Sequence, residues 1–262
     1  MSKWHGYVID NLEWMESVLA PNSTTRFELI LTDAPYNTGI RQERKRTDGT
    51  ESYGYDDSFY DFKTFLYPRL CAFHKILTDK GSLLLMLDYR EVHYAKVWLD
   101  EIFGRECFKN EIIWAYDYGA RCKDRWPCKH DTVLWYVKDP DNYTFNYDAI
   151  DRIPYMAPDL QTEERAELGK TPTDVWWNTI VPTNGREKTG YATQKPLKLF
   201  ERLVRVHSNE SDWVLDPFAG SGTTAEACLK LNRNCILIDT NKDTWGIWDD
   251  RLRLVQPELP MS

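Results

Sequence analysis

The chain has 262 residues, of which 42% are hydrophobic and 28% are charged, and its formal net charge is −8. This is the length and composition of a globular domain with room for a small inserted module. The negative net charge excludes a protein that binds nucleic acid over its whole surface, but it does not exclude a local basic face. No apolar run approaches the roughly 20 residues of a membrane-spanning helix, and the first residues lack a secretory signal pattern, so we expect a cytoplasmic protein with no membrane partner.

Strand-like and helical patterns alternate along the chain. Short apolar runs predict strands at 28–32, 82–87, 111–116, 132–137, 213–216 and 234–239. Helical spacing predicts helices at 62–77, 91–103, 196–208, 223–231 and 242–255, with Pro196 in the first turn of its helix. This alternation predicts the α/β class, with a doubly wound, mostly parallel twisted sheet and helices on both faces.

Two stretches interrupt the alternation. Residues 40–58 contain Gly, Asp, Tyr and basic side chains without a core face, so we expect a mobile loop there. Residues 140–190 are rich in proline and aromatic side chains, as in "TPTDVWWNTIVPTNG", and are expected to form a small irregular insertion.

Two short windows, "RQERKR" at 41–46 and "RCKDRWPCKH" at 121–130, concentrate positive charge. They are either a local nucleic-acid-binding face or ordinary solvated loops. The candidate contacts are Arg41, Arg44, Lys45, Arg46, Arg121, Lys123, Arg125 and Trp126.

The six cysteines form no C-x-x-C pair, so reduced thiols are expected. Cys122, Cys128 and His130 lie close in sequence but make a poor zinc site. No metal is expected.

The stretch "DWVLDPFAGSGTTAEACLKLNRNCILID" reads as a strand, a glycine-rich turn, a helix and a second strand that ends in Asp239. Gly220 and Gly222 would let a ligand approach backbone amides at the positive end of the helix, and Asp239 could accept hydrogen bonds from both ribose hydroxyls. The spacing differs from G-x-G-x-x-G, and the lysine of a P-loop is missing. The pattern therefore favours a nucleoside ligand without a tightly held triphosphate.

A second stretch, "LILTDAPYNTG" at 29–39, ends an apolar run in a carboxylate, a rigid turn and an aromatic ring. "TDAPYNTG" resembles the catalytic D-P-P-Y motif of amino-group DNA methyltransferases, and "DPFAGSGTT" resembles their S-adenosylmethionine motif. The catalytic motif comes first here, which is the order of the beta group. Further matching segments are "GSLLLMLDYREVHYAKVWLDEIFG", "NEIIWAY", "KHDTVLWYVK" and "GYATQKPLKLFERLV".

The resemblance implies methylation of the exocyclic amine of a flipped DNA base, with S-adenosylmethionine as cofactor and DNA as partner, and suggests a restriction-modification setting in a bacterium or phage. It implies a class I methyltransferase-like fold in permuted motif order. Residues 1–139 would form the catalytic half of one domain and 191–262 its cofactor-binding half. Residues 140–190 would be the candidate target-recognition region.

The D-P-P-Y resemblance also assigns the catalytic roles. Asp33 and the backbone carbonyl of Ala34 would accept the two hydrogens of the amine, favouring the pyramidal nitrogen of the transition state. Pro35 would keep the turn rigid, and Tyr36 would stack on the extruded base. Ala34 stands where the family usually has a first proline, so we expect a looser loop and not an inactive site.

Nine residues are candidate cofactor contacts by the same resemblance. Asp216 and Phe218 have simpler alternatives, a turn-forming carboxylate and core packing. In the "YATQKP" segment, the resemblance places Gln194 and Lys195 near the methionine carboxylate of the cofactor or near the catalytic loop. The alternative for this segment is helix capping by Thr193 with an exposed Lys195. The candidates are Asp216, Phe218, Gly220, Gly222, Thr223, Asp239, Thr193, Gln194 and Lys195.

An aspartate at position 33 mostly accompanies N6-adenine methylation in this family, which favours adenine over the N4 amine of cytosine. Methylation at C5 of cytosine needs a cysteine nucleophile, and the Pro-Cys pair at 127–128 stands in the wrong motif order. A catalytically silent DNA-binding homologue or subunit remains an alternative. Residues 140–190 show no helix suited to reading base edges, so we expect a short or relaxed target sequence, or dependence on a homodimer partner.

Overall fold

The computed structural model describes residues 2–21, 23–42, 54–119, 121–182 and 185–255. In this part of the chain the main sheet has eight strands in the order β1-β10-β9-β2-β5-β7-β6-β8. The first five pair in parallel, β7 is antiparallel to both neighbours, and β8 is parallel to β6. The strands are β1 (Trp4–Val8), β2 (Phe27–Asp33), β5 (Leu77–Leu87), β6 (Phe108–Ala115), β7 (His130–Val137), β8 (Val175–Trp177), β9 (Trp213–Asp216) and β10 (Asn234–Asp239).

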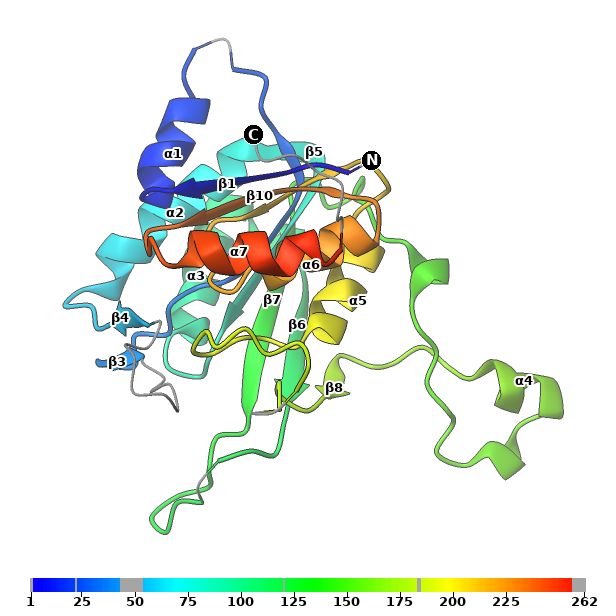
Figure 1. Cartoon of the computed structure of the whole chain (residues 1–262). Helices are drawn as coiled ribbons and strands as arrows, with labels where there is room; N and C mark the ends of the chain where they lie inside the picture. Colours follow the sequence, from blue (N-terminus) through cyan, green and yellow to red (C-terminus); the bar gives the residue numbers. More distant parts are fainter. Residues whose placement is uncertain (1, 22, 43–53, 120, 183–184, 256–262) are drawn as a thin grey trace.

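Helices cover both faces of this sheet (Figure 1). α1, α2 and α3 pack against one another and onto β5 and β7, whereas α5, α6 and α7 pack together and onto β2, β9 and β10. The predicted doubly wound α/β fold is therefore confirmed. The helices are α1 (Asn11–Val18), α2 (Phe62–Ile76), α3 (Val92–Phe103), α4 (Glu163–Leu168), α5 (Leu197–His207), α6 (Thr223–Lys230) and α7 (Thr244–Arg253), with 3-10 turns η1 (Arg105–Cys107), η2 (Tyr147–Ala149) and η3 (Pro158–Leu160).

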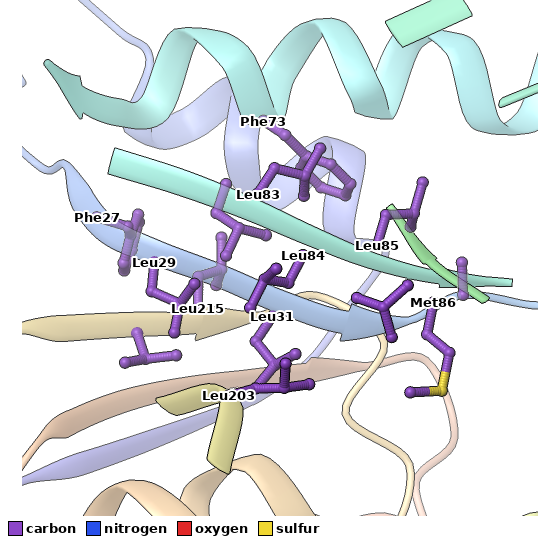
Figure 2. Close-up of a cluster of buried hydrophobic side chains, with 14 of the residues drawn as sticks. Phe27, Leu29, Leu31, Phe73, Leu83, Leu84, Leu85, Met86, Leu203 and Leu215 are labelled. Carbon is purple, nitrogen blue, oxygen red and sulfur yellow. The ribbon is translucent and has the colours of Figure 1, made fainter. Parts of the chain in front are cut away.

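The core lies on both faces of the central strands. The run Leu83–Leu87 in β5 is fully buried, as expected for a strand covered by helices on two sides. Figure 2 shows Phe73 of α2 on one face, near Leu83, and Leu203 of α5 on the other, near Leu31. Because successive side chains of a strand point to opposite faces, this uninterrupted apolar run joins the two layers.

The loop prediction for residues 40–58 is wrong at its described ends. β3 (Ile40–Gln42) and β4 (Tyr55–Asp57) pair as a two-stranded antiparallel sheet. The carboxylate of Asp57 is 1% exposed and accepts hydrogen bonds from the backbone of Asn37 and Thr38. Polar contacts order this hairpin, and its sequence therefore lacks the alternating apolar pattern by which a strand is predicted. Residues 43–53, with the predicted contacts Arg44, Lys45 and Arg46, lie outside the described residues.

The insertion at 140–190 is not wholly irregular. β8 pairs with β6, opposite Ile113–Ala115, and is the last strand on that side of the sheet. Before it, the chain runs out into an arm that carries η3 and α4 (Figure 1). At the other end of the sheet, β1 and the following α1 were not predicted. β1 pairs with β10, so the first strand of the chain lies beside the last one.

The described residues contain neither a helix that could span a membrane nor a cluster of metal-binding side chains. Their helices are all too short or too polar to span a bilayer. No three His, Cys, Asp or Glu side chains among them are grouped so as to hold a metal ion.

Candidate active site

The two predicted motifs meet at one cavity. β2 and β9 are parallel neighbours, and β10 lies next to β9, so the turns that follow the three strands leave the sheet at the same edge. A cavity of about 500 Å³ opens there, lined by Asp33, Pro35, Phe218, Gly220 and Asp239 among others. Segments about 180 positions apart in the chain thus share one binding space.

Asp239 holds the glycine turn in place. Its Oδ2 accepts a hydrogen bond from the backbone N–H of Gly220 and its Oδ1 accepts one from that of Asn241, both at 2.8 Å. Burial raises the pKa of the Asp239 carboxyl. Gly220 has φ +47°, and a Cβ there would lie 3.0 Å from the ring of Tyr191. Glycine at 220 therefore allows both the backbone conformation and the close aromatic wall.

Other predicted cofactor contacts divide into two groups. Phe218 and Thr223 line the cavity, whereas Gly222 does not. Gly222 has φ +73°, and a Cβ there would lie 2.7 Å from Trp248. Packing against α7 requires glycine at position 222. A glycine-rich sequence pattern alone cannot distinguish this requirement from the close approach of a ligand.

Asp216 lines the cavity, but its oxygens already have protein partners. Oδ1 accepts hydrogen bonds from Thr32 Oγ1 at 2.8 Å and the backbone N–H of Phe218 at 3.2 Å. Oδ2 accepts one from Thr224 Oγ1. Burial raises the pKa of the Asp216 carboxyl to about 7. These hydrogen bonds fit the alternative role of Asp216 as a turn-forming carboxylate, and its place in the cavity wall fits the predicted role as a cofactor contact.

The "YATQKP" segment forms another wall of the cavity. Thr193 adopts φ +57°. Gln194 uses its side chain internally: Oε1 accepts from Thr189 N–H at 2.9 Å and Nε2 donates to Glu187 O at 2.6 Å. Lys195 is 8% exposed, so the alternative of an exposed lysine is wrong.

Lys195 points at the catalytic turn. Its Nζ lies 2.5 Å from Asp33 Oδ2 and 4.9 Å from the centre of the Tyr36 ring. The Tyr36 hydroxyl donates to Asp33 Oδ1 at 2.6 Å. Ala34 is 2% exposed and packs in the core. Of the other predicted catalytic residues, Tyr36 contacts the Asp33 carboxylate directly, and Lys195, a candidate cofactor contact, does so as well.

A second carboxylate, Asp131, lies beside this group and was not predicted. It belongs to β7 and is 5% exposed. Its Oδ2 is 3.2 Å from the Tyr36 hydroxyl and 4.0 Å from Lys195 Nζ, and its Oδ1 accepts from the Tyr116 hydroxyl at 3.1 Å. Its only sequence signal is an aspartate at the start of "KHDTVLWYVK", a polar residue next to a buried strand.

A further polar group, also not predicted, closes the cavity beside Pro217. Asn11 donates to Pro217 O at 2.6 Å, and its Oδ1 accepts from Arg69 Nε at 2.7 Å. Arg69 is also paired with Asp10 at 2.6 Å. The "DN" pair at 10–11 after a short strand was the available signal.

The described basic residues of the predicted nucleic-acid face are exposed. Arg41 lies in β3. Arg121, Lys123, Arg125 and Trp126 lie in the connection between β6 and β7, which extends beyond the edge of the sheet (Figure 1). Arg121 pairs with Asp117 at 2.6 Å and Arg125 with Asp124 at 3.3 Å, so acidic neighbours offset part of the positive charge.

Known sequences resemble the chain over most of its length. The DNA methylase family model (N6_N4_Mtase) matches residues 27–247. The type II methyltransferase M.HpaI of Haemophilus parainfluenzae is 32% identical over 228 residues, covering 86% of this chain and 68% of that protein. The DNA adenine methyltransferase YhdJ of Escherichia coli is 31% identical over 229 residues, covering 82% and 72%.

Solved structures share the fold. The M1.HpyAVI–SAM complex superposes with a TM-score of 0.64 at 23% identity, covering 95% of this chain and 99% of that one. The PvuII DNA methyltransferase, described as cytosine-N4-specific, superposes with a TM-score of 0.63 at 18% identity, covering 98% and 94%.

Proposed function

The chain belongs to the beta group of amino-DNA methyltransferases, and within that family we propose that it methylates the N6 amine of adenine. At family level it is an S-adenosylmethionine-dependent enzyme that methylates an exocyclic amino group of a DNA base. Adenine is favoured by Asp33 in the catalytic motif and by the likeness to the adenine methyltransferase YhdJ.

The cavity suits the cofactor in size and chemistry. Its volume of about 500 Å³ falls within the roughly 300–1,000 Å³ typical of cofactor sites. We expect Asp239 to accept hydrogen bonds from ribose hydroxyls and the turn at 218–220 to border the nucleoside. When bound, the cofactor supplies an electrophilic methyl group on a sulfonium.

Asp33 is the residue on which the chemistry depends. An exocyclic amine is a poor nucleophile because its lone pair is delocalised into the ring of the base. A carboxylate and the Ala34 carbonyl that accept the two amine hydrogens would favour the pyramidal nitrogen that attacks the methyl group. The observation that carries this proposal is that Asp33 lines the same cavity as Gly220 and Asp239.

Tyr36 is proposed to stack on the extruded base. Its hydroxyl is anchored to Asp33, and the Lys195 ammonium lies over its ring. A base would therefore stack on the ring face that Lys195 leaves open. Such stacking contributes roughly 1–3 kcal/mol.

Nucleoside mass spectrometry tests the proposal. The protein is incubated with S-adenosylmethionine and unmethylated genomic DNA, which is then digested to nucleosides. We expect N6-methyladenine from the wild type and none from Asp33→Asn, a change that keeps the shape of the side chain but removes its charge. N4-methylcytosine as the product would replace the adenine assignment. Cofactor binding without any methylated nucleoside would favour a silent DNA-binding homologue or subunit.

The recognition site and assembly are also proposals. We expect DNA contacts from Arg41 and the exposed 121–126 segment, a short or relaxed target read partly by residues 140–190, and action in a bacterial cytoplasm as part of restriction-modification. Methylome sequencing of expressing cells and light scattering of the pure protein test target length and dimerisation. A long, strictly read site made by a monomer would contradict the relaxed or dimer-dependent interpretation.

A further inference from the structure

The catalytic carboxylate is already engaged on both oxygens. Asp33 Oδ1 accepts from the Tyr36 hydroxyl at 2.6 Å, and Oδ2 lies 2.5 Å from the Lys195 ammonium. Each carboxylate oxygen can accept a second hydrogen bond. However, an ammonium in direct contact neutralises the charge that would polarise the base amine. For Asp33 to act at full strength, Lys195 has to weaken its hold.

Asp131 is placed to receive Lys195. Its Oδ2 is 4.0 Å from Lys195 Nζ, against 2.5 Å for Asp33 Oδ2. A small rotation about the end of the lysine side chain would exchange one carboxylate for the other without exposing the ammonium to solvent. Asp131 itself is held by Tyr116, whose hydroxyl donates to Oδ1 at 3.1 Å.

The described groups that face Asp131 are Asp33, Tyr36, Tyr116 and Lys195. Burial and, to a smaller extent, Asp33 raise the pKa of the Asp131 carboxyl to about 6, while Lys195 acts in the opposite direction. Burial also raises the pKa of the Tyr36 and Tyr116 hydroxyls, so both stay protonated. Asp33 and Asp131 thus share one neighbouring cation, Lys195, which can pair closely with only one of the two carboxylates at a time.

From this geometry we propose that Asp131 is a positioning residue that draws Lys195 away from Asp33 when the target amine arrives. The inference rests on the proposed methyl transfer to an exocyclic amine. In the free enzyme Lys195 occupies Asp33 and keeps it in place. In the complex the amine takes over Asp33, and Asp131 becomes the counter-ion of Lys195.

A purely structural role for Asp131 is the competing explanation, because it also anchors two tyrosines. The two roles differ in how they depend on Lys195. If Asp131 acts by drawing Lys195 away, its loss matters only while Lys195 is present. If it only holds the tyrosines, its loss costs the same with or without the lysine.

The test is a double-mutant cycle on single-turnover methyl transfer, with Asp131→Asn introduced into the wild type and into Lys195→Met. The probe is unmethylated genomic DNA at saturating concentration. We expect Asp131→Asn to slow transfer by about tenfold or more in the wild type and by less than about twofold beside Lys195→Met. The affinity for S-adenosylmethionine should not change. Equal losses in both backgrounds would overturn the inference while leaving the proposed function intact.

Asp100 provides a matched control in the same fold. It accepts from the Tyr136 hydroxyl at 2.6 Å and pairs with Lys96 at 2.7 Å, so it also has a tyrosine and a lysine partner, but Lys96 does not line the cavity, whereas Lys195 does. Asp100→Asn should reduce thermal stability and leave the transfer rate unchanged. A rate loss equal to that of Asp131→Asn would assign the effect to folding and overturn the inference.

A readout independent of turnover covers the case in which Lys195→Met is inactive. The ¹⁵N resonance of the Lys195 ammonium should shift when S-adenosylhomocysteine and the DNA are added to the wild type, and stay unchanged in Asp131→Asn. No shift in the wild type, or the same shift in the variant, would contradict the exchange of partners. A wild type that yields no methylated nucleoside of any kind would remove the proposed function and this inference together.

Discussion

Thr32 Oγ1 donates a 2.8 Å hydrogen bond to Asp216 Oδ1, and both side chains are buried. Thr32 directly precedes Asp33, the predicted catalytic carboxylate, in β2, and Asp216 ends β9 just before the glycine turn. The two strands are parallel neighbours. This contact ties the end of β2 to the end of β9, so the turns that follow the two strands share one anchor.

Asp216 should make stability depend on pH. Burial raises the pKa of its carboxyl from 3.8 to about 7, so the folded protein holds a proton that the unfolded chain releases. The stabilising contribution is present below pH about 4 and is lost as the pH rises to about 7. Between pH about 5.5 and about 8, this group should lower the unfolding free energy of the wild type by about 2 kcal/mol. In Asp216→Asn this decrease should be absent. Urea denaturation of both proteins at the two pH values measures this, and parallel profiles would contradict it.

Gly222→Ala should destabilise the protein by about 2 kcal/mol or more. A Cβ at φ +73° is strained, and it would lie 2.7 Å from the fully buried Trp248. Gly246→Ala is the control, because Gly246 lies in α7 with no atom near the added carbon, and it should gain about 0.5–1 kcal/mol of helix propensity. Thermal unfolding measures the stability of both variants. A Gly222→Ala protein as stable as the wild type would show that the Trp248 side chain can move aside.

Asp239→Asn should weaken S-adenosylmethionine binding. Charged hydrogen bonds contribute roughly 1.5–3 kcal/mol, so we expect the dissociation constant to rise about 10- to 100-fold. Asp212→Asn is the control, since Asp212 also accepts a backbone hydrogen bond, from Asn209 at 2.7 Å, but is not among the residues that line the cavity. Isothermal titration calorimetry measures both. Equal affinity in the two variants would argue against a ribose contact at Asp239.

Trp126→Ala should weaken DNA binding without affecting the cofactor. Trp126 is 93% exposed between basic residues, and base–aromatic stacking contributes roughly 1–3 kcal/mol. We expect an increase of about 5- to 100-fold in the dissociation constant for unmethylated duplex DNA by fluorescence anisotropy. Leu254→Ala, at an exposed apolar residue after α7, should bind DNA as the wild type does. Similar affinities for all three proteins would indicate that the 121–126 segment is only a solvated loop.

Ala34→Pro tests the departure from the family motif. The residue before Pro35 already favours an extended backbone, and the proposed role of Ala34 uses only its carbonyl. We therefore expect the single-turnover rate to change by less than about tenfold. A gain of several hundredfold would show that the natural loop is badly aligned.

Local pattern was enough for much of the fold. The predicted strands at 213–216 and 234–239 have the bounds of β9 and β10, and α2 and α6 each end within one residue of their prediction. These elements have strong apolar periodicity or a glycine turn at their ends. β1, β8 and the β3–β4 hairpin were missed because almost none of their side chains are buried, and pairing or Asp57 orders them without leaving a periodic apolar signal.

The sequence by itself determined the α/β class, the two motifs and the candidate carboxylate at Asp33, because each depends on neighbouring residues and their spacing. Only the tertiary structure decided that Asp131 lies beside that carboxylate, and that Lys195, expected near the cofactor or the catalytic loop, contacts Asp33 itself. The place of Asp131 follows from the arrangement of the sheet. The reason is the strand order β2-β5-β7 with β7 reversed. Because β7 runs antiparallel to β5, its first residues lie at the same end of the sheet as the last residues of β2. Strands so distant in the chain are paired by the packing of the whole sheet and not by a local sequence pattern.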